Sequence, residues 1–423
     1  MRALSLLLAT LWFAFPLMAQ PNELPAEQRE YQQEKEAALQ SSIHKLYPPN
    51  VFKNLSQLEA GLAKSPDSST LLKQARWMLP DPNSVVPAHV SRIMGSLKFK
   101  HDQHATSILY TPDDTGLLTC SRDGTVRLWN LHNGLAAKTW NLGAPLGAMS
   151  LSPDGKLLAV AEGYRLYPRI DLSSFPSQEE YAIHLIDLQA GSVVAKLTGI
   201  RAPILALSFS ADGKQLACGG QPVKGEPLHI WNVARRELSR SFKSIHTINN
   251  LAWSNTGTRL FCTSSNKSID IFDVTKGEQI QSVQERGTLY AMALSPDQEY
   301  LAVGGDITEE NNYQVIRIYF IKDLRQVAFL GGHQGSIVSL AYHQDGQKLV
   351  CGTSRLENTI KVWNVNQKTA TAQYLGHTGD VLGIAFSKQG NNLASVSLDG
   401  SIRLWLTSEV KAPETLQQSS SPV

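Results

Sequence analysis

The chain has 423 residues, of which 42% are hydrophobic and 18% charged, and its formal net charge is +2. This composition is that of a soluble globular protein with room for one large domain and a small one. The small net charge and the lack of a basic stripe or a base-stacking aromatic pattern argue against a nucleic-acid partner, and against a strongly acidic one.

The first 19 residues have the pattern of an export signal. Arg2 precedes an apolar core at residues 3–15, and Ala19 is a small residue before Gln20. The apolar run is short for a membrane span, although a retained anchor is the alternative. No Cys stands at the cleavage point to carry a lipid. We therefore expect a periplasmic or secreted protein with no stable membrane span after signal cleavage, and first of all the periplasm of a Gram-negative bacterium.

Residues 20–90 are expected to form a small helical segment and a linker. Apolar residues recur at helical spacing on both sides of a break at residues 65–67, as in one tetratricopeptide-like helical hairpin. One such hairpin cannot bury its own apolar face, so we expect it to pack on the rest of the protein. At the other end, residues 408–423 are rich in Ser, Gln and Pro and are predicted to be a disordered tail.

A β-hairpin pattern occurs near both ends of the remaining chain. Residues 117–129 read LLTCSRDGTVRLW and residues 393–405 read LASVSLDGSIRLW. In both, Asp-Gly separates two alternating runs, which is a strong hairpin signal because the two-residue turn needs positive φ values that Gly and Asp tolerate. Looser copies of the pattern lie between the two, so the chain is built from repeats.

Seven copies align on a large apolar residue that precedes a polar turn and on an apolar residue that closes the third run. The first set is Tyr110, Leu151, Phe209, Trp253, Leu294, Tyr342 and Phe386, and the second is Trp129, Ile186, Trp231, Phe272, Tyr319, Trp363 and Trp405. Once the extra residues within each copy are subtracted, the step between copies is 41 or 42 residues throughout. A period of about 40–45 residues with four short strands is the sequence mark of a propeller blade.

Residues 91–407 resemble the WD-repeat family. Trp-Asn closes the third strand at residues 129–130, 231–232 and 363–364, and Gly-His precedes the first strand at residues 332–333 and 376–377. The resemblance implies an all-β, seven-bladed propeller of four-stranded blades. Because the seventh copy ends after three strands, we expect Arg92–Phe99 to supply its fourth strand and close the ring, which removes open sheet edges.

Two copies carry a matched polar set. The members are His101, Ser121, Asp123 and Trp129 in the first copy, and His377, Ser397, Asp399 and Trp405 in the last. The resemblance implies a hydrogen-bonded network within each blade, and a buried Asp and an indole N–H need such partners. A His/Ser/Asp set also fits a hydrolase, but its occurrence twice, each time within one blade, favours a structural role. The sixth copy has Glu357-Asn358 in place of Asp-Gly.

No other motif predicts catalysis, a cofactor or a metal site. The sequence contains no P-loop, dinucleotide fingerprint or nucleophile elbow, and its 11 His form no ligand-spaced cluster. One column of the third strands is interpreted as a polar strand face, with Arg127, His184, His229, Asp270, Arg317, Lys361 and Arg403. The second strands contain Cys120, Cys218, Cys262 and Cys351, and we predict free, buried thiols because equivalent positions in different blades lie too far apart to bridge.

All extra residues fall between the second and third strands of four copies, at residues 162–181, 221–227, 306–314 and 354–358. In a propeller these loops open onto one face with the blade-to-blade loops, and loops on a rigid scaffold are where binding evolves. Tyr and Arg are enriched at binding hot spots. The predicted partner-binding residues are Tyr164, Arg165, Tyr167, Arg169, Phe175 and Tyr181. The alternative is that these side chains plug the channel mouth or hold the loop down.

The predicted function is a non-catalytic protein-interaction scaffold in the cell envelope, which docks a protein partner on the insert-bearing face and needs no cofactor. Two alternatives stay open. The propeller could be an enzyme or a small-ligand binder that uses the channel mouth, or the N-terminal helical hairpin could be the recruiting element.

Overall fold

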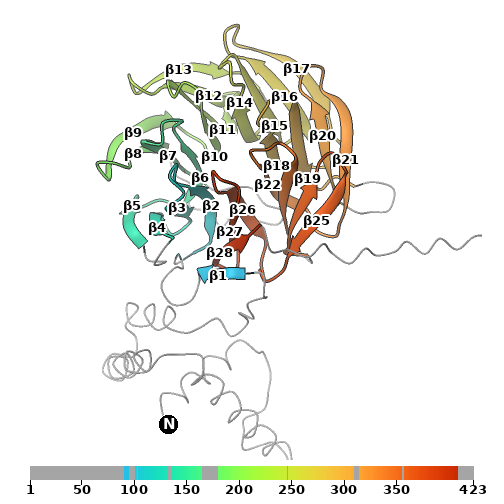
Figure 1. Ribbon diagram of the computed structural model, residues 1–423. Coiled ribbons are helices and arrows are strands. Elements are labelled where there is room, and N and C mark those ends of the chain that lie inside the picture. The colour runs from blue at the N-terminus through green and yellow to red at the C-terminus, as the bar shows by residue number, and fades with distance from the viewer. Residues whose placement is uncertain are drawn as a thin grey trace, which may run out of the picture. The chain divides into compact units, whose positions relative to one another are not determined.

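The computed structural model describes residues 90–94, 101, 103–131, 136–163, 180–244, 246–308, 314–354 and 357–407. These residues form 28 strands in seven four-stranded sheets, which are arranged as the blades of a ring (Figure 1). The all-β, seven-bladed propeller predicted from the repeat period is confirmed. The predicted export signal, helical segment and C-terminal tail lie outside the described residues.

In each blade the four strands are ordered from the central channel to the outside, and neighbouring strands are antiparallel. Blades one to three contain β2 (Ala105–Tyr110), β3 (Gly116–Ser121), β4 (Thr125–Asn130) and β5 (Ala136–Asn141); β6 (Leu146–Leu151), β7 (Leu157–Glu162), β8 (Tyr181–Asp187) and β9 (Ser192–Ile200); and β10 (Ile204–Phe209), β11 (Gln215–Val223), β12 (Glu226–Asn232) and β13 (Glu237–Phe242). Blades four to six contain β14 (Ile248–Trp253), β15 (Arg259–Ser264), β16 (Ser268–Asp273) and β17 (Glu278–Gln284); β18 (Leu289–Leu294), β19 (Tyr300–Gly305), β20 (Gln314–Phe320) and β21 (Arg325–His333); and β22 (Ile337–Tyr342), β23 (Lys348–Thr353), β24 (Ile360–Asn364) and β25 (Thr369–Tyr374). Blade seven contains β26 (Val381–Phe386), β27 (Asn392–Ser397), β28 (Ile402–Leu406) and, as its outer strand, β1 (Val90–Met94).

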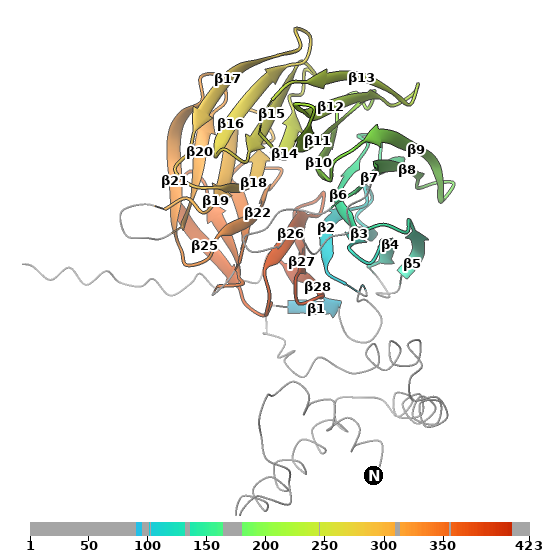
Figure 2. The same cartoon turned by 180° about the vertical axis from the view of Figure 1, so that it is seen from behind.

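Blade seven is therefore built from both ends of the propeller (Figure 2). β1 pairs with β28, with Arg92 opposite Leu404 and Met94 opposite Ile402. The prediction that a segment before the first repeat completes the last blade is confirmed. The strand spans residues 90–94 rather than 92–99, and residues 95–100 lie outside the described part of the chain.

A side chain on the face opposite the inserts also joins blades one and seven. Asp114 has a φ of +56° and occupies the turn position where several other blades have glycine, for example Gly155 and Gly213. Its carboxylate accepts hydrogen bonds from the backbone N–H groups of Lys388 at 2.7 Å and Gln389 at 3.1 Å. The residue that accepts an unfavourable backbone conformation thereby bonds the first blade to the last.

The hydrophobic core lies between the blades. Seven buried clusters each join two consecutive blades, including the pair formed by blades seven and one. The residue that closes each third strand packs against the preceding blade, so that Trp129 contacts blade seven and Trp405 contacts blade six. Each interface removes apolar surface from water, and together they hold the loops of both faces on a rigid frame.

Candidate functional site

The two faces of the propeller differ in how much their loops vary. Five residues separate the first strand from the second in every blade, and these turns form one face. Between the second and third strands the separation ranges from two to 18 residues. We call the face formed by these variable connections the insert face.

The blade-to-blade connections belong to the same face. Gly163 donates its backbone N–H to Pro145 O at 2.8 Å, and Asp306 donates to Thr288 O at 2.9 Å. Ser354 donates in the same way to Ser336 O at 3.0 Å. Each bond joins the start of an insert to the connection that enters the same blade, as expected from the repeat pattern.

A buried carboxylate anchors the insert of blade two. Glu162 ends β7 and is 4% exposed. Its oxygens lie 2.7 Å from His184 Nε2, 3.2 Å from Lys196 Nζ and 3.1 Å from the backbone N of Ala182. Burial opposes ionisation, but the hydrogen bonds from His184 and Lys196 hold the pKa of Glu162 below its usual value. The two ends of this long insert are thus fixed to each other.

The insert contains most of the predicted partner-binding residues. Tyr164, Arg165, Tyr167, Arg169 and Phe175 lie outside the described residues. Tyr181 begins β8, is 6% exposed and packs in the cluster between blades two and three. Tyr181 is therefore a core residue and not a contact for a partner. Because Tyr181 is already part of β8, its side chain packs against blade three, which the count of insert residues did not take into account.

The insert of blade three is a hairpin extension. β11 is nine residues long and Val223 pairs with Glu226, so the predicted insert at residues 221–227 continues the second and third strands. Lys224 and Gly225 form the turn with φ values of +53° and +77°. This two-residue turn leaves Lys224 exposed at the tip.

Acidic side chains also anchor the inserts of blades five and six. Asp306 accepts hydrogen bonds from the hydroxyls of Tyr290, at 3.0 Å, and of Ser336. Glu357 lies 2.5 Å from Lys361 Nζ and accepts the backbone N–H groups of Gln334 and Gly335 at 3.1 and 3.2 Å. The sequence analysis did not identify the anchoring role of these carboxylates. The signal that could have found them is an acidic residue at the start of each insert or just before its third strand.

Apolar side chains pack where the inner strands meet the insert face. Val338 and Leu382 are fully buried, and Tyr290 and Leu398 pack against them. Within the described residues no group of three His, Cys, Asp or Glu side chains is placed to hold a metal ion. Val338 and Leu382 therefore belong to the packed frame beneath the insert face and not to its exposed surface.

In blade one the polar set forms a network that includes a residue not predicted. His101 lies 3.1 Å from Asp123 Oδ2 through Nδ1 and 2.8 Å from Thr119 Oγ1 through Nε2. Trp129 donates its indole N–H to the same Thr119 hydroxyl at 2.8 Å. Burial would raise the pKa of Asp123, but the hydrogen bonds from His101 and Thr125 hold that pKa well below its usual value.

The strand hydroxyl was assigned two residues too far along the chain. Thr119 and, in blade seven, Ser395 occupy the bridging position predicted for Ser121 and Ser397. Ser121 and Ser397 instead accept the backbone N–H of Asp123 and Asp399, each at 3.1 Å, and so fix the turns. The rest of the second network repeats the first, with His377 bonded to Asp399 at 2.8 Å and Trp405 to Ser395 at 2.8 Å. Burial lowers the pKa of His377.

Two middle blades replace the network with other chemistry. In blade six His333 Nε2 lies 3.8 Å from Cys351 Sγ, and Cys351 occupies the column of Thr119. In blade five Glu285 occupies the position that His101 has in blade one, and Tyr319 occupies the position of Trp129. The Tyr319 hydroxyl donates a hydrogen bond to the Glu285 carboxylate. These positions therefore serve to hold each blade together.

The third-strand column is less uniform than the single polar face that was predicted. His184 bonds to Glu162, His229 lies 2.8 Å from the Ser241 hydroxyl, and Arg317 lies 3.2 Å from Glu285. Asp270 accepts hydrogen bonds from Ser268, at 2.7 Å, and Ser282, at 2.6 Å. Arg403 is 1% exposed and Asp270 is 4% exposed, so several members of the column are buried and do not form an exposed polar face.

All four cysteines are free and buried, as predicted. Burial raises the pKa of Cys218 and of Cys351 to about 12, and it raises that of Cys262 well above its usual value. Because the thiolate is the reactive form, these side chains behave as small apolar core residues.

Comparison with known proteins agrees with the repeat pattern. The family model "WD domain, G-beta repeat" matches residues 95–130, 324–364 and 368–405. The chain is 23% identical over 348 residues to Telomerase Cajal body protein 1 of Bos taurus, which covers 77% of this chain and 54% of that protein. It is 22% identical over 336 residues to the B-type cell cycle switch protein ccs52B of Medicago truncatula, and the match covers 71% of this chain and 66% of that protein.

A further match is 31% identical over 127 residues to the Periodic tryptophan protein 2 homolog of Neurospora crassa, covering 30% and 13% of the two chains. The chain spans about half the length of the Telomerase Cajal body protein 1 sequence from Bos taurus. The matched repeats belong to blades one, six and seven, which keep the His and Trp columns best. Together with the seven-bladed ring, they show that this chain is a seven-bladed β-propeller that contains WD40 repeats.

Proposed function

We propose that this chain is a non-catalytic scaffold whose insert face docks a protein partner. WD40 propellers are typically protein-interaction platforms, and what carries the assignment of the face is the asymmetry between the two sides. One face has seven turns of equal length, and the other has connections of two to 18 residues. Variable loops on a constant frame are the usual arrangement of a binding surface.

The anchoring of the inserts supports this proposal. Glu162, Asp306 and Glu357 each bond the base of an insert to a neighbouring segment. A loop whose ends are fixed in advance loses less conformational freedom on binding than a free loop does, so more of the contact energy contributes to affinity.

Replacing Tyr164, Arg165, Tyr167 and Arg169 together by alanine is expected to reduce partner capture at least tenfold. The reason is that these side chains are of the types that dominate binding energy. The measurement is affinity capture with the full-length protein after crosslinking, with quantification by mass spectrometry. The melting temperature should stay unchanged, because the substituted residues come between β7 and β8 in the chain and belong to neither strand.

The matched control replaces four exposed lysines on the opposite face by alanine: Lys156, Lys214, Lys348 and Lys388. It should leave capture intact. Equal capture by wild type and the insert variant, or equal loss in both variants, would reject the assignment of the face. A variant that lacks residues 20–88 tests the helical hairpin as the recruiting element, since loss of capture with an intact propeller would favour the hairpin.

The same capture separates the remaining classes of partner. Capture that persists after nuclease treatment supports a protein partner and the proposal that no nucleic acid is bound. Stoichiometric metal in the purified protein, or turnover of a small molecule, would favour an enzyme or ligand binder.

We propose export from the cytoplasm on the sequence of residues 1–19 alone. In the described part of the chain, no helix has the length and apolar character needed to cross a bilayer. The relatives named above are eukaryotic, so they lend no support to a bacterial periplasm. The intact mass of the mature protein tests this proposal, because signal cleavage predicts a chain that begins at Gln20.

A further inference from the structure

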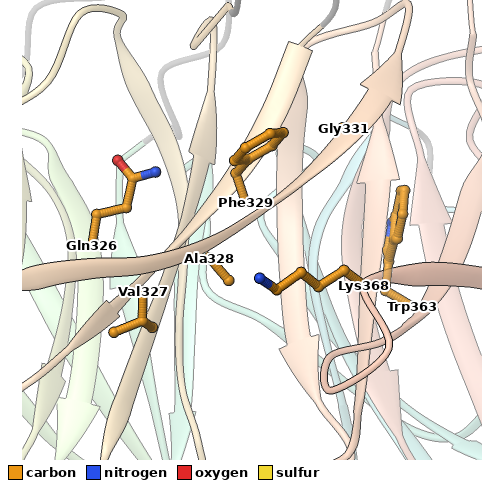
Figure 3. A pocket seen from close by; sticks show the side chains of 7 residues that line it. All are labelled: Gln326, Val327, Ala328, Phe329, Gly331, Trp363 and Lys368. Atoms are coloured by element: carbon orange, nitrogen blue, oxygen red, sulfur yellow. The ribbon is translucent and has the colours of Figure 1, made fainter.

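The outer wall of the propeller carries a groove between blades five and six, away from the insert face. It has a volume of about 510 Å³ and is lined by Gln326, Val327, Ala328, Phe329 and Gly331 of β21 and by Trp363 and Lys368 of blade six (Figure 3). β21 is the last strand of its sheet. One edge of β21 therefore offers backbone N–H and C=O groups without a strand partner.

A small side chain, Ala328, lies in the wall of the groove. Ala328 is opposite Ile318 in its sheet, and the equivalent residues of blades one and three are Lys138, opposite Leu128, and Arg240, opposite Ile230. Lys138 and Arg240 reach the next blade so closely that any side chain on Gly191 or Gly277 would collide with them. Ala328 is too short to reach across in this way, which contributes to the open space, and Ala195 of blade two and Ala372 of blade six share this position.

An aromatic side chain stands at the rim of the groove. Phe329 is 51% exposed, although most apolar side chains of the blades are buried. Val327, Ala328 and the edge of Trp363 complete an apolar lining. An exposed aromatic residue beside a hollow is typical of a place where a partner buries an apolar side chain.

The charge of the groove selects the partner. Lys368 extends across the opening toward Ala328 (Figure 3). No acidic residue lines the groove, and among the described residues no ion pair involves Lys368. A carboxylate placed beside a large apolar side chain would therefore meet both an unpaired cation and the aromatic rim.

We infer that this groove binds a short extended peptide that carries an aromatic or large aliphatic residue next to a carboxylate. The open edge of β21 favours a peptide over a compact ligand, because a peptide backbone can pair with it. Val327 is a bulge, since Gln326 pairs with Tyr319 and Ala328 with Ile318. A bulge interrupts regular pairing, so we expect the peptide to engage only a short stretch of the strand. This surface is separate from the insert face and would allow the scaffold to hold a second partner.

The test is selection of a random 12-residue peptide library on the full-length protein. Selection is expected to enrich peptides with Asp or Glu within two residues of Phe, Tyr, Trp or Leu. A labelled peptide from that selection should lose at least tenfold in affinity to the F329A and K368E variants, measured by fluorescence polarisation. Selection repeated on K368E should return Lys or Arg in the acidic position.

The matched control is R236E, at the same turn position of blade three. Arg236 and Lys368 have similar φ values, +59° and +57°. Blade two precedes Arg236 as blade five precedes Lys368, and blade two has Lys196 at the position of Phe329. R236E should leave the affinity unchanged, and all three variants should melt like wild type because the side chains are exposed. Failure to enrich any peptide, a consensus without an acidic residue, or affinity that F329A and K368E leave intact would overturn the inference. Unchanged capture at the insert face by these variants would keep the two surfaces distinct.

Discussion

Replacing Trp405 by alanine is expected to lower the free energy of unfolding by about 3–5 kcal/mol, the range for truncation of a buried aromatic side chain. The Trp405 side chain is fully buried between blades six and seven. Its ring lies 5.2 Å from that of Tyr374, and its indole N–H donates to Ser395 Oγ at 2.8 Å. The cavity would open at a blade of the ring closure, where β1 must also pair with β28.

Urea denaturation followed by circular dichroism measures this change. The W405F variant keeps most of the apolar contact and loses the indole hydrogen bond, so we expect a cost nearer about 1–3 kcal/mol. The F329A variant removes an aromatic ring that is 51% exposed and should stay within about 0.5 kcal/mol of wild type. A W405A protein as stable as F329A would show that the interface of blades six and seven is not packed as described.

Replacing Glu285 by alanine is expected to cost about 3–5 kcal/mol, the range for removal of one partner of a buried ion pair. Glu285 is 4% exposed and its carboxylate lies 3.2 Å from Arg317 Nη1. The Tyr319 hydroxyl donates to the same carboxylate, and burial together with this contact raises the pKa of Tyr319 well above its usual value. Loss of the carboxylate would leave both groups without this buried acceptor.

A double-mutant cycle separates the pair from the rest of the site. If the two side chains act as a unit, E285A combined with R317M should cost clearly less than the two single changes added together. Additive effects of the two changes would contradict the paired arrangement in blade five. Urea midpoints of the four proteins supply the measurement.

The repeat period predicted the ring because it depends on columns of apolar side chains, and these columns are the blade interfaces. Trp129, Phe272 and Trp405 could be aligned by counting, and each packs against the preceding blade. The outer strand of blade seven was predictable for the same reason, since a blade with three strands leaves an edge to be covered.

The parts that counting could not supply depend on side-chain direction. Thr119 and Ser121 are two residues apart on one strand and both have hydroxyls, so only the position of the indole decides which one bridges His101 and Trp129. Tyr181 was counted as a loop residue because the sequence does not show where β8 begins. The base of an insert looks like loop sequence until its hydrogen bonds are known, which is why the anchoring role of Glu162 was missed.

The wall groove illustrates the same limit. Alignment of the outer strands could have shown Ala328 in the column of Lys138 and Arg240. The consequence depends on how far those side chains reach across an interface, and only the structure shows this.

The pairing of β1 with β28 is the most direct test of the closed seven-bladed ring. Cysteine pairs at positions 92 and 404, or 94 and 402, place two thiols opposite each other, whereas a pair at 92 and 402 is offset by two residues. The offset adds about 7 Å along the strand, beyond the reach of a disulfide. In the full-length protein, mild oxidation should link both in-register pairs, seen as a two-hydrogen mass loss and faster migration without reductant, and should leave the offset pair reduced. In-register pairs that stay reduced, or an offset pair that oxidises more readily, would contradict closure of the ring by β1.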